Sequence, residues 1–468
     1  MVFSSPLFLF AFLPAVIGLY FLTPRPAKNS LLLGASLLFY LVGSGAYVLI
    51  LIGSIVWNYA LALAIDRADG RRRKEWLALA IAGNLAPLLI YKYGAFGVTV
   101  INQVLAWKAW APFALPHLFL PAGISFFTFQ GISYLIDIFR RELPPCRSLR
   151  DYALYKSFFP QLIAGPIVRY RDLARELQNR ASSLAGVEAG LVRFGFGLGK
   201  KILLADNLGR VADSVFGLHG GDLTTATAWL GILCYTFQIF SDFSGYSDMA
   251  IGLGRVFGLT LPENFRQPYR SASVTEFWRR WHITLSTWFR DYFYFPLGGN
   301  RLGMFRTGFN LVLVFFLCGL WHGAAWTFVG WGLYQGVLLL AERVLRIRWG
   351  IEPSGLPGRA LPFLLVLIGW VFFRSHSFSE ALDFLRTMFG HSSAPSPLFS
   401  AAHYLTGNNV CYLLLAALCA FWPEHKARDG AAPSLLAAFR PYAALVVTAL
   451  AMIAQSPQSF NPFIYFQF

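Results

Sequence analysis

A single histidine lies within a long uncharged, apolar stretch of the chain. The residues from Phe309 to Ala341 include no Asp, Glu, Lys or Arg, and near their middle stands the sequence Gly-Leu-Trp-His-Gly, in which the histidine is His322. Removal from water keeps an imidazole neutral, and a neutral imidazole is what a general base needs to take a proton from a hydroxyl. The flanking glycines are expected to leave room for a substrate. A buried histidine bonded to a backbone carbonyl explains these residues equally well.

A second group of polar residues lies between residues 273 and 290. Ser273 followed by Glu276 is a capping box, which predicts that a helix begins there. On that helix, polar side chains at steps of three and four residues form one stripe, consisting of Arg279, His282, Ser286 and Arg290. Arginines suit an anionic, phosphate-bearing substrate. The alternative is an interfacial helix whose arginines face lipid headgroups and whose tryptophans form an aromatic belt.

A third polar group interrupts the apolar sequence from Phe240 to Met249. It contains Asp242 and Asp248 together with serines and a tyrosine. Paired carboxylates occur in hydrolases, but a sequence alone gives no distance between the two acids. We expect that they brace a broken helix and pair with nearby arginines, while both stay candidates for donor binding. The five cysteines share no metal-ligand spacing, so neither a metal site nor a disulfide framework is predicted.

The composition excludes a soluble protein. Apolar residues make up 56% of the chain and charged residues only 13%, about half the share of a soluble domain. The net charge of +16 raises the question of nucleic-acid binding. However, the basic residues lie in short stretches between apolar runs, such as Arg71–Lys74 and Arg140–Arg141. This is the distribution of a membrane protein with positive loops on the cytoplasmic side, near anionic lipid headgroups, and it predicts no nucleic-acid partner.

The apolar residues are arranged in runs that approach the length of about 20 residues needed to cross a bilayer. These runs occupy residues 8–23, 31–43, 46–65, 76–91, 118–138, 228–240, 310–341, 361–373, 410–422 and 443–453. Several are short for a full span, so some helices are expected to be tilted, broken or re-entrant. The predicted fold class is therefore all-α, a polytopic membrane protein with about 10–12 transmembrane helices.

The charges of the first loops predict the orientation of the chain. Arg25 and Lys28 follow the first run and Arg71–Lys74 follows the third, whereas the turn near Gly43–Gly45 carries no charge. Because cytoplasmic loops concentrate Lys and Arg, the N-terminus is predicted to lie on the periplasmic side. Residues 1–468 are predicted to form a single membrane domain with a loop at Arg348–Arg359. Its parts are N-terminal helices (1–139), a more polar interfacial or cytoplasmic segment (140–225), the core motifs (226–345) and C-terminal helices (346–468).

Taken together, these motifs resemble the bacterial branch of the membrane-bound O-acyltransferase family, and within it the alginate O-acetylation type. The strongest likeness runs from Gln267 through the Glu-Phe-Trp-Arg-Arg-Trp-His sequence that ends at His282, and on to the Trp-His-Gly sequence at His322. Further matching segments are Val2–Ser5, Gly123–Phe127, Phe159–Pro166, Asp242–Asp248 and Gly298–Arg301. The likeness covers nearly the whole chain and weakens after about residue 390.

The resemblance implies a ring of transmembrane helices around a central funnel, with the family's invariant histidine, here His322, at its narrow point. The family's second polar position falls on His282. Proteins of this type take an acyl group from a cytoplasmic thioester and deliver it toward the outer face of the bacterial inner membrane. A separate periplasmic transferase of the SGNH type then places it on a polysaccharide. Acetyl-CoA is the expected donor, and no permanently bound cofactor is implied.

Chemical reasoning assigns further roles within this family. A thioester reaction needs a base, oxyanion donors and a cationic mouth for phosphates. Arg279, Arg280 and Arg290 are candidates for the phosphates, Trp321 is a candidate for orientation or oxyanion binding, and Ser286 is a further donor-binding candidate. One alternative is transfer of D-alanine or another acyl group from a carrier-protein thioester. Another is a transporter of polysaccharide or lipid-linked sugar, which predicts internal repeats that the sequence lacks.

Overall fold

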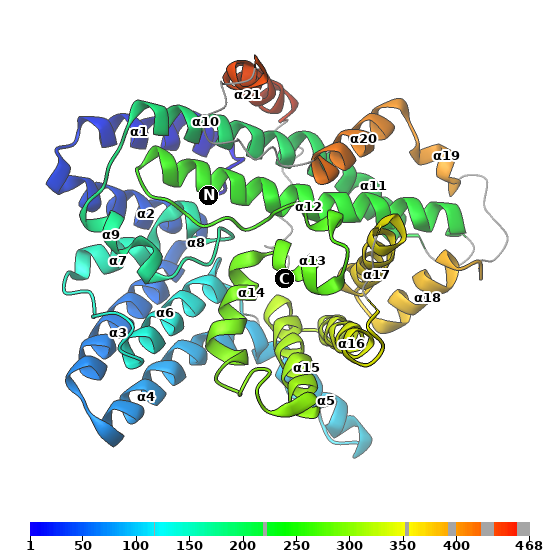
Figure 1. Cartoon of the computed structure of the whole chain (residues 1–468), viewed down its shortest axis with the longest axis horizontal. Helices are drawn as coiled ribbons and strands as arrows, with labels where there is room; N and C mark the ends of the chain where they lie inside the picture. Colours follow the sequence, from blue (N-terminus) through cyan, green and yellow to red (C-terminus); the bar gives the residue numbers. More distant parts are fainter. Residues whose placement is uncertain (117, 219–221, 352–354, 392–398, 423–434, 456–468) are drawn as a thin grey trace. The chain divides into compact units, whose positions relative to one another are not determined.

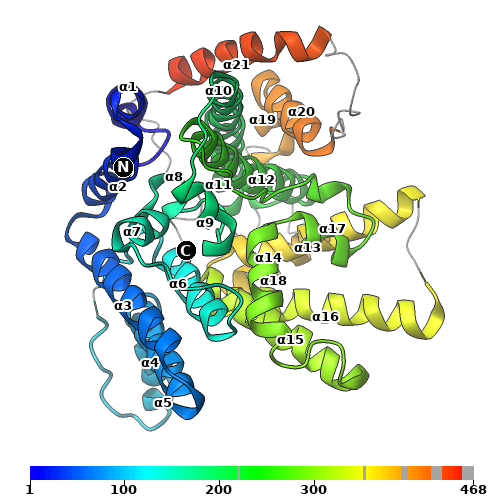
Figure 2. The same cartoon turned by 60° about the vertical axis from the view of Figure 1, so that its left-hand side comes forward.

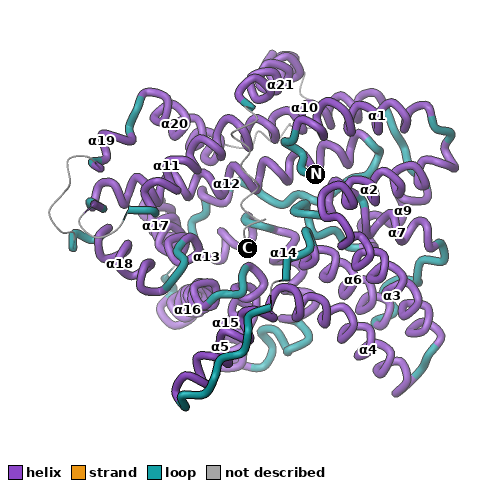
Figure 3. The backbone as a smooth tube through the Cα atoms, turned by 180° about the vertical axis from the view of Figure 1, so that it is seen from behind, coloured by secondary structure: helices purple, strands orange, loops and turns teal. Residues whose placement is uncertain are grey.

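A computed structural model describes residues 1–116, 118–218, 222–351, 355–391, 399–422 and 435–455 of the chain. Within these ranges the backbone consists of helices joined by loops, and no residue lies in a strand (Figure 3). The prediction of an all-α membrane protein is thus confirmed. The chain divides into two compact units, of which the first comprises Met1–Leu191 and Ala250–Pro262 and the second comprises Val192–Met249 and Glu263–Phe468.

The first unit is built from the N-terminal helices, coloured from blue through cyan to blue-green in Figure 1. They are α1 (Leu13–Leu22), α2 (Lys28–Ser44), α3 (Val48–Arg67), α4 (Gly70–Leu88), α5 (Gly94–Trp107), α6 (Ile124–Phe139), α7 (Leu149–Ser157), α8 (Phe159–Leu162) and α9 (Tyr170–Gln178). Helices α3, α4 and α6 pack on one another, and α3 and α4 lie side by side in both Figure 1 and Figure 2. Helix α10 (Leu184–Gly199) begins in this unit and continues into the second.

The second unit contains most of the motifs found in the sequence. Its helices are α11 (Asp206–Phe216), α12 (Thr225–Val256, whose last residues belong to the first unit), α13 (Val274–Arg280), α14 (Ile283–Phe289), α15 (Gly303–His322), α16 (Trp326–Trp349), α17 (Gly355–Arg374), α18 (Phe378–Met388), α19 (Ala401–Tyr404), α20 (Gly407–Phe421) and α21 (Leu435–Ala454). π-Helical turns interrupt the regular helices at Lys200–Ala205 and Arg290–Tyr294.

Three helical stretches among the described residues are long and apolar enough to cross a membrane. They are Arg25–Arg67, Gly70–Trp107 and Gly303–His322, judged by length and composition. Shorter apolar helices occur at Phe8–Leu22, Ile124–Phe139, Gly407–Phe421 and Ala438–Ala454. Many large apolar side chains on these helices are exposed, as expected of surfaces that face lipid. The total number of transmembrane spans stays a prediction.

The apolar run at residues 310–341 is not one span but a tight hairpin of α15 and α16. Glycines allow the two helices to touch along their length: a Cβ on Gly319 would lie 2.2 Å from the carbonyl oxygen of Phe328, and a Cβ on Gly332 would lie 2.3 Å from that of Phe315. Gly336 approaches Val312 in the same way. As residue numbers rise on one helix they fall on the other, so the helices are antiparallel. Small residues permit this close approach of backbones within a membrane.

The polar segment at residues 273–290 is not one helix either. The predicted start is confirmed, because the Ser273 side chain accepts a hydrogen bond from the Glu276 N–H at the N-terminus of α13. However, α13 ends at Arg280, and Trp281 is extended. His282 then adopts a left-handed conformation with φ 42° and ψ 56°, after which α14 begins. The predicted continuous polar stripe is therefore wrong, because this break removes His282 from a shared helical face.

Two smaller predictions about helix boundaries also need correction. The acidic segment at residues 240–249 lies within α12, a helix of 32 residues without a break, so Asp242 and Asp248 do not brace a broken helix. The predicted loop at Arg348–Arg359 is shorter than expected, because α16 extends to Trp349 and α17 starts at Gly355. Residues 352–354 of that loop lie outside the described residues.

Candidate active site

His322 is the last residue of α15, at the closed end of the α15–α16 hairpin. The chain leaves the helix there because Gly323 is extended, with φ −160° and ψ 150°. The imidazole is buried among aromatic rings, with centroids 4.9 Å from Trp321, 5.1 Å from Trp331 and 5.2 Å from Phe373. A ring held on three sides in this way has a defined orientation, as a general base requires.

The sequence suggested that the glycines beside His322 leave room for a substrate. The structure shows that they do not, because both positions are filled by neighbouring atoms. A Cβ on Gly319 would meet the Phe328 carbonyl, and a Cβ on Gly323 would lie 2.1 Å from the Phe328 ring. Both glycines therefore serve the packing of the hairpin. The hairpin in turn places His322, so the glycines still matter for the site, but through backbone contact.

His282 is fully buried and is held by Asn264. The Asn264 Oδ1 accepts bonds from the backbone N–H and the hydroxyl of Thr284, at 3.2 and 2.9 Å, so this atom is the amide oxygen. It lies 3.1 Å from His282 Nδ1, which must therefore carry the proton and donate. In the neutral ring the lone pair then resides on Nε2. Asn264 thus selects the tautomer of His282 and holds it in a left-handed backbone conformation that is uncommon for residues other than glycine.

Trp321 connects the two histidines. Its ring lies 5.8 Å from the His282 ring and 4.9 Å from the His322 ring, both in edge-to-face geometry. This arrangement is favourable because the positive edge of one aromatic ring is attracted to the negative face of the other. The structure therefore brings His282, Trp321 and His322 into one buried cluster of rings.

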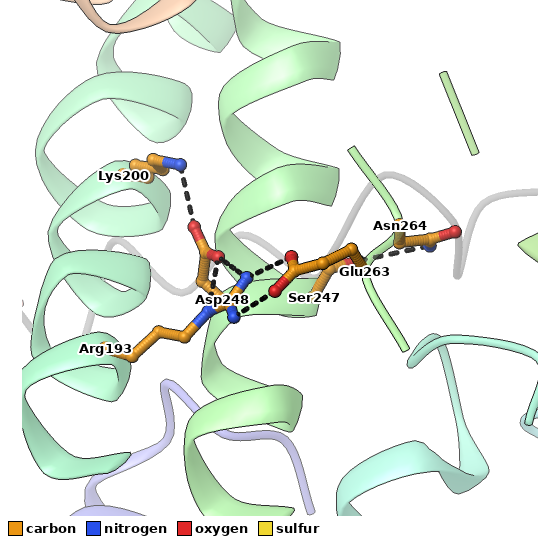
Figure 4. A network of polar contacts seen from close by, with 6 residues as sticks. All are labelled: Arg193, Lys200, Ser247, Asp248, Glu263 and Asn264. Atoms are coloured by element: carbon orange, nitrogen blue, oxygen red, sulfur yellow. Dashed lines mark hydrogen bonds and ion pairs between the residues drawn. The ribbon is translucent and has the colours of Figure 1, made fainter. Parts of the chain in front are cut away.

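A network of charged side chains holds the segment that carries Asn264 (Figure 4). Arg193 on α10 bonds Asp248 on α12 at 2.8 Å and Glu263 at 2.6 Å, and Lys200 bonds the other oxygen of Asp248 at 2.7 Å. Glu263 immediately precedes Asn264, whose side-chain amide reaches Ser247 at 3.3 Å. These bonds attach α10 and α12 to the segment whose Asn264 holds His282.

Asp242 has a comparable role six residues earlier on α12. It is buried and lies 2.8 Å from Lys201, which also contacts Asp206 at 2.7 Å. The partners of the two α12 carboxylates are thus Arg193 and two lysines, where the sequence suggested arginines. A buried carboxylate of this kind needs a nearby cation to offset its loss of hydration. These contacts indicate that Asp242 and Asp248 hold α12 to the neighbouring segments rather than bind the donor.

A cavity of about 520 Å³ lies alongside the α15–α16 hairpin. Its wall on α15 is one helix face, formed by Leu311, Val314, Phe315 and Cys318. Its wall on α16 is likewise one face, formed by Leu339, Glu342, Arg343, Arg346 and Ile347. The segment from α13 to the following π-helical turn closes it with Thr275, Trp278, Arg279, Ile283, Leu285, Ser286, Thr287, Phe289, Arg290 and Tyr294.

The cavity is charged at one end and reaches toward His322 at the other. Cys318 precedes His322 by one helical turn, so the cavity extends to within a turn of the histidine. Arg343 lies near the open end of the hairpin, about 20 Å from Cys318 along its axis at 1.5 Å per residue. Its Nε is buried and has no hydrogen-bond partner among the described residues. Such a donor is costly to bury unless a ligand satisfies it.

The predicted arginines differ in where the structure places them. Arg279, Ser286 and Arg290 line the cavity together, although they do not share one helix. Arg280 does not line it, since its guanidinium bonds Glu276 at 2.7 Å on the same short helix. The glutamate of α16, Glu342, accepts bonds from the backbone N–H groups of Val274 and Thr275 and so attaches α13 to the hairpin.

The sequence does not single out three residues of the site. Asn264 and Cys318 carry no charge, and each stands alone in an ordinary local sequence, so no local signal marked them. Arg343 lies in a basic stretch that has the appearance of a positive loop. The sequence does show that Arg343 lies on one helix face with Leu339 and Arg346. However, this face becomes part of a cavity only because α13 packs against it.

Asn264→Ala is expected to lower acyl transfer by about 10-fold or more, since the amide fixes the tautomer and orientation of His282. His282→Ala should lower it at least as much, without abolishing it. The double variant should lose little beyond the His282 variant, because the two side chains act as a unit. Initial rates of the four purified proteins check this. Fully additive losses would show that Asn264 acts independently of His282.

The apolar helices, the buried histidine pair and the cavity lined by arginines are what the resemblance to membrane-bound O-acyltransferases leads one to expect. The chain belongs to the membrane-bound O-acyltransferase family: residues 139–349 match the model of that family, and relatives match over the full length. It is an O-acyltransferase and a membrane protein, as predicted.

Among its relatives is a protein described as a probable alginate O-acetylase AlgI of Pseudomonas putida, 42% identical across the whole of both chains. A protein of the same description from Azotobacter vinelandii is 41% identical, again over both full lengths. The peptidoglycan O-acetyltransferase of Helicobacter pylori is 39% identical over 83% of this chain and 80% of its own. Two of the three descriptions name alginate, and all three describe O-acetylation of a polymer.

Proposed function

We propose that this protein takes an acetyl group from a cytoplasmic thioester, with acetyl-CoA as the donor, and passes it across the inner membrane for O-acetylation of an exopolysaccharide such as alginate. The observation that carries the proposal is the cavity beside the α15–α16 hairpin. Arg343 and Arg346 line it toward the open end of the hairpin, with Glu342 beside them, and Cys318, one helical turn before His322, lines it toward the closed end. Acetyl-CoA has a matching arrangement, since its charged phosphates lie at one end of the molecule and its reactive acyl group lies at the other.

The catalytic step follows from this arrangement. His322 is the general base that removes the proton from an acceptor hydroxyl as its oxygen attacks the thioester carbonyl. The carbon–sulfur bond then breaks, and the thiolate leaves with the proton that the imidazole has taken. His282, with its proton fixed on Nδ1, orients Trp321 and completes the cluster. Nothing in this step calls for a covalent acyl-enzyme or a metal ion.

The delivery of the acetyl group beyond the membrane belongs to the same proposal. The N-terminus lies on the periplasmic side, and the arginine-lined end of the cavity is open to the cytoplasm, where the positive loops lie. A periplasmic SGNH-type partner receives the group and places it on the polysaccharide. The names of the alginate and peptidoglycan relatives support a polysaccharide as the final acceptor.

A carrier-protein thioester is the second candidate donor. The teichoic acid D-alanyltransferase of Bacillus subtilis is 28% identical over 63% of this chain. To separate the donors, purified protein in nanodiscs is supplied with radiolabelled acetyl-CoA, acetylated carrier protein or D-alanylated carrier protein. We expect rapid release of free coenzyme A and label on the acceptor only with acetyl-CoA. Turnover with a carrier protein alone would contradict the acetyl-CoA part of the proposal and leave the acyltransferase assignment intact.

Arg343→Gln is expected to raise the KM for acetyl-CoA by about 10-fold or more with a smaller effect on kcat, since the arginine binds phosphate away from the reacting carbonyl. Arg279→Gln and Arg290→Gln should act in the same direction, more weakly, because both side chains are exposed. Arg348→Gln, on the same helix but outside the cavity, is the matched control. An unchanged KM in the Arg343 variant would place the donor phosphates elsewhere.

A further inference from the structure

A second cavity, of about 700 Å³, lies within the first unit and carries a different set of charges. It is formed where α1 ends, where α2 and α7 begin and where the chain leaves α9. Four basic residues line it, namely Arg25, Lys28, Arg150 and Arg180, against one acidic residue, Asp151. Such an excess of cations in a concave site attracts anions.

Among the residues that line this cavity, Arg180 has the least compensated charge. All three of its guanidinium nitrogens are buried, and none has a hydrogen-bond partner among the described residues. The side chain is held in place, since a Cβ on Gly258 would lie only 2.8 Å from the Arg180 Cγ. A buried guanidinium without an acceptor is strongly unfavourable, so its retention indicates a ligand that supplies acceptor oxygens.

The remaining charges leave this anion site uncompensated. Asp151 is already engaged, since it accepts hydrogen bonds from Asn29 at 2.8 Å and from Arg150 at 3.0 Å. Burial acts to raise the pKa of Asp151, but these hydrogen bonds outweigh it and hold the pKa below its ordinary value. The Asp151 carboxylate therefore stays charged, and its charge is directed at Asn29 and Arg150. The Lys28 ammonium lies 4.2 Å from the centre of the Tyr20 ring, with no carboxylate within ion-pair distance in the described chain.

The border of the cavity indicates where its ligand comes from. Phe21, which lines the cavity, is 45% exposed, and the adjacent Leu22 is 84% exposed. Both end the apolar helix α1, whose exposed side chains are suited to acyl chains of a bilayer. Arg25 and Lys28 also lie at the connection from α1 to α2, which the charge pattern assigns to the cytoplasmic side, where anionic lipids are concentrated.

We propose that this cavity binds the phosphate group of an anionic ligand at the cytoplasmic membrane surface, with Arg180, Lys28 and Arg25 as its contacts. The headgroup of an anionic phospholipid is the favoured source, and a soluble phosphate compound shares the same chemistry. The site is distinct from the donor cavity, which is lined entirely by residues of the other unit. It does not depend on the proposed function.

The experiment measures the melting temperature of the full-length protein in a neutral detergent by tryptophan fluorescence. Short-chain phosphatidylglycerol, short-chain phosphatidylcholine, glycerol phosphate and inorganic phosphate are each titrated. Phosphatidylglycerol is expected to raise the melting temperature by about 2 °C or more, and phosphatidylcholine to have little effect. In the Arg180→Gln and Lys28→Gln variants, the phosphatidylglycerol concentration that gives half of this shift should be at least about tenfold higher than in the wild type.

Arg175→Gln is the matched control, because Arg175 is exposed on α9 and does not line the cavity. It should respond as the wild type does. Without ligand, Arg180→Gln should melt no lower than the wild type, since no bond of the arginine is lost. A shift produced by the soluble phosphates alone would identify a free phosphate as the ligand. An anion response that survives in both variants, or no response to any anion, would overturn the proposal.

Discussion

His322→Gln is expected to reduce acyl transfer by at least about 100-fold, the usual contribution of a positioned general base. Glutamine nearly fills the volume of the imidazole but cannot take a proton from a hydroxyl at neutral pH. The surrounding Trp321, Trp331 and Phe373 should keep their packing, so the variant should insert and fold. Initial rates with purified protein, and the acetate content of the cell's polysaccharide, both measure the effect.

The control for this prediction is His376→Gln. His376 is an exposed histidine of the same unit, in the turn between α17 and α18, and its replacement should leave the rate unchanged. Melting temperatures of both variants should agree with the wild type within a few degrees. If the His322 variant acylates at a normal rate, the histidine is a packed core residue and the catalytic assignment is wrong.

Gly319→Val should have the second large effect, but through folding. A Cβ at this position would lie 2.2 Å from the Phe328 carbonyl oxygen and 3.1 Å from the Gly332 Cα, both backbone atoms that cannot rotate away. The helices of the hairpin must therefore separate, at a cost of about 3 kcal/mol. Because His322 ends the same helix, activity should fall together with stability. The yield of monodisperse protein and the melting temperature measure this loss.

Gly34→Val provides the comparison. Gly34 lies within α2, is exposed, and a Cβ there would meet no atom within 4 Å. The substitution is equally large and also falls within an apolar helix, yet it should change stability by less than about 1 kcal/mol. If the two variants lose stability equally, valine acts through helix propensity and the close contact of α15 with α16 is not the cause.

Much of this protein follows from short-range features of its sequence. Apolar runs with basic residues between them predict membrane helices because a bilayer admits no unsatisfied backbone. Ser273 and Glu276 predict the start of α13 because a helix N-terminus needs a local acceptor for its free N–H groups. His322 stands out for the same kind of reason, since a lone polar group in a long uncharged stretch is costly and therefore functional by default.

The tertiary structure decided everything that depends on contacts between distant residues. The predicted polar stripe continued through His282 and the apolar run continued through residues 310–341, yet both segments are broken. One break fixes a histidine against Asn264, and the other allows two glycine-rich helices to pack. Arg343 and Cys318 became parts of one cavity for a related reason, because a helix face belongs to a site only once another element covers it. Local sequence determines which helices form; the packing of backbones and the pairing of buried polar groups determine where they end and what they enclose.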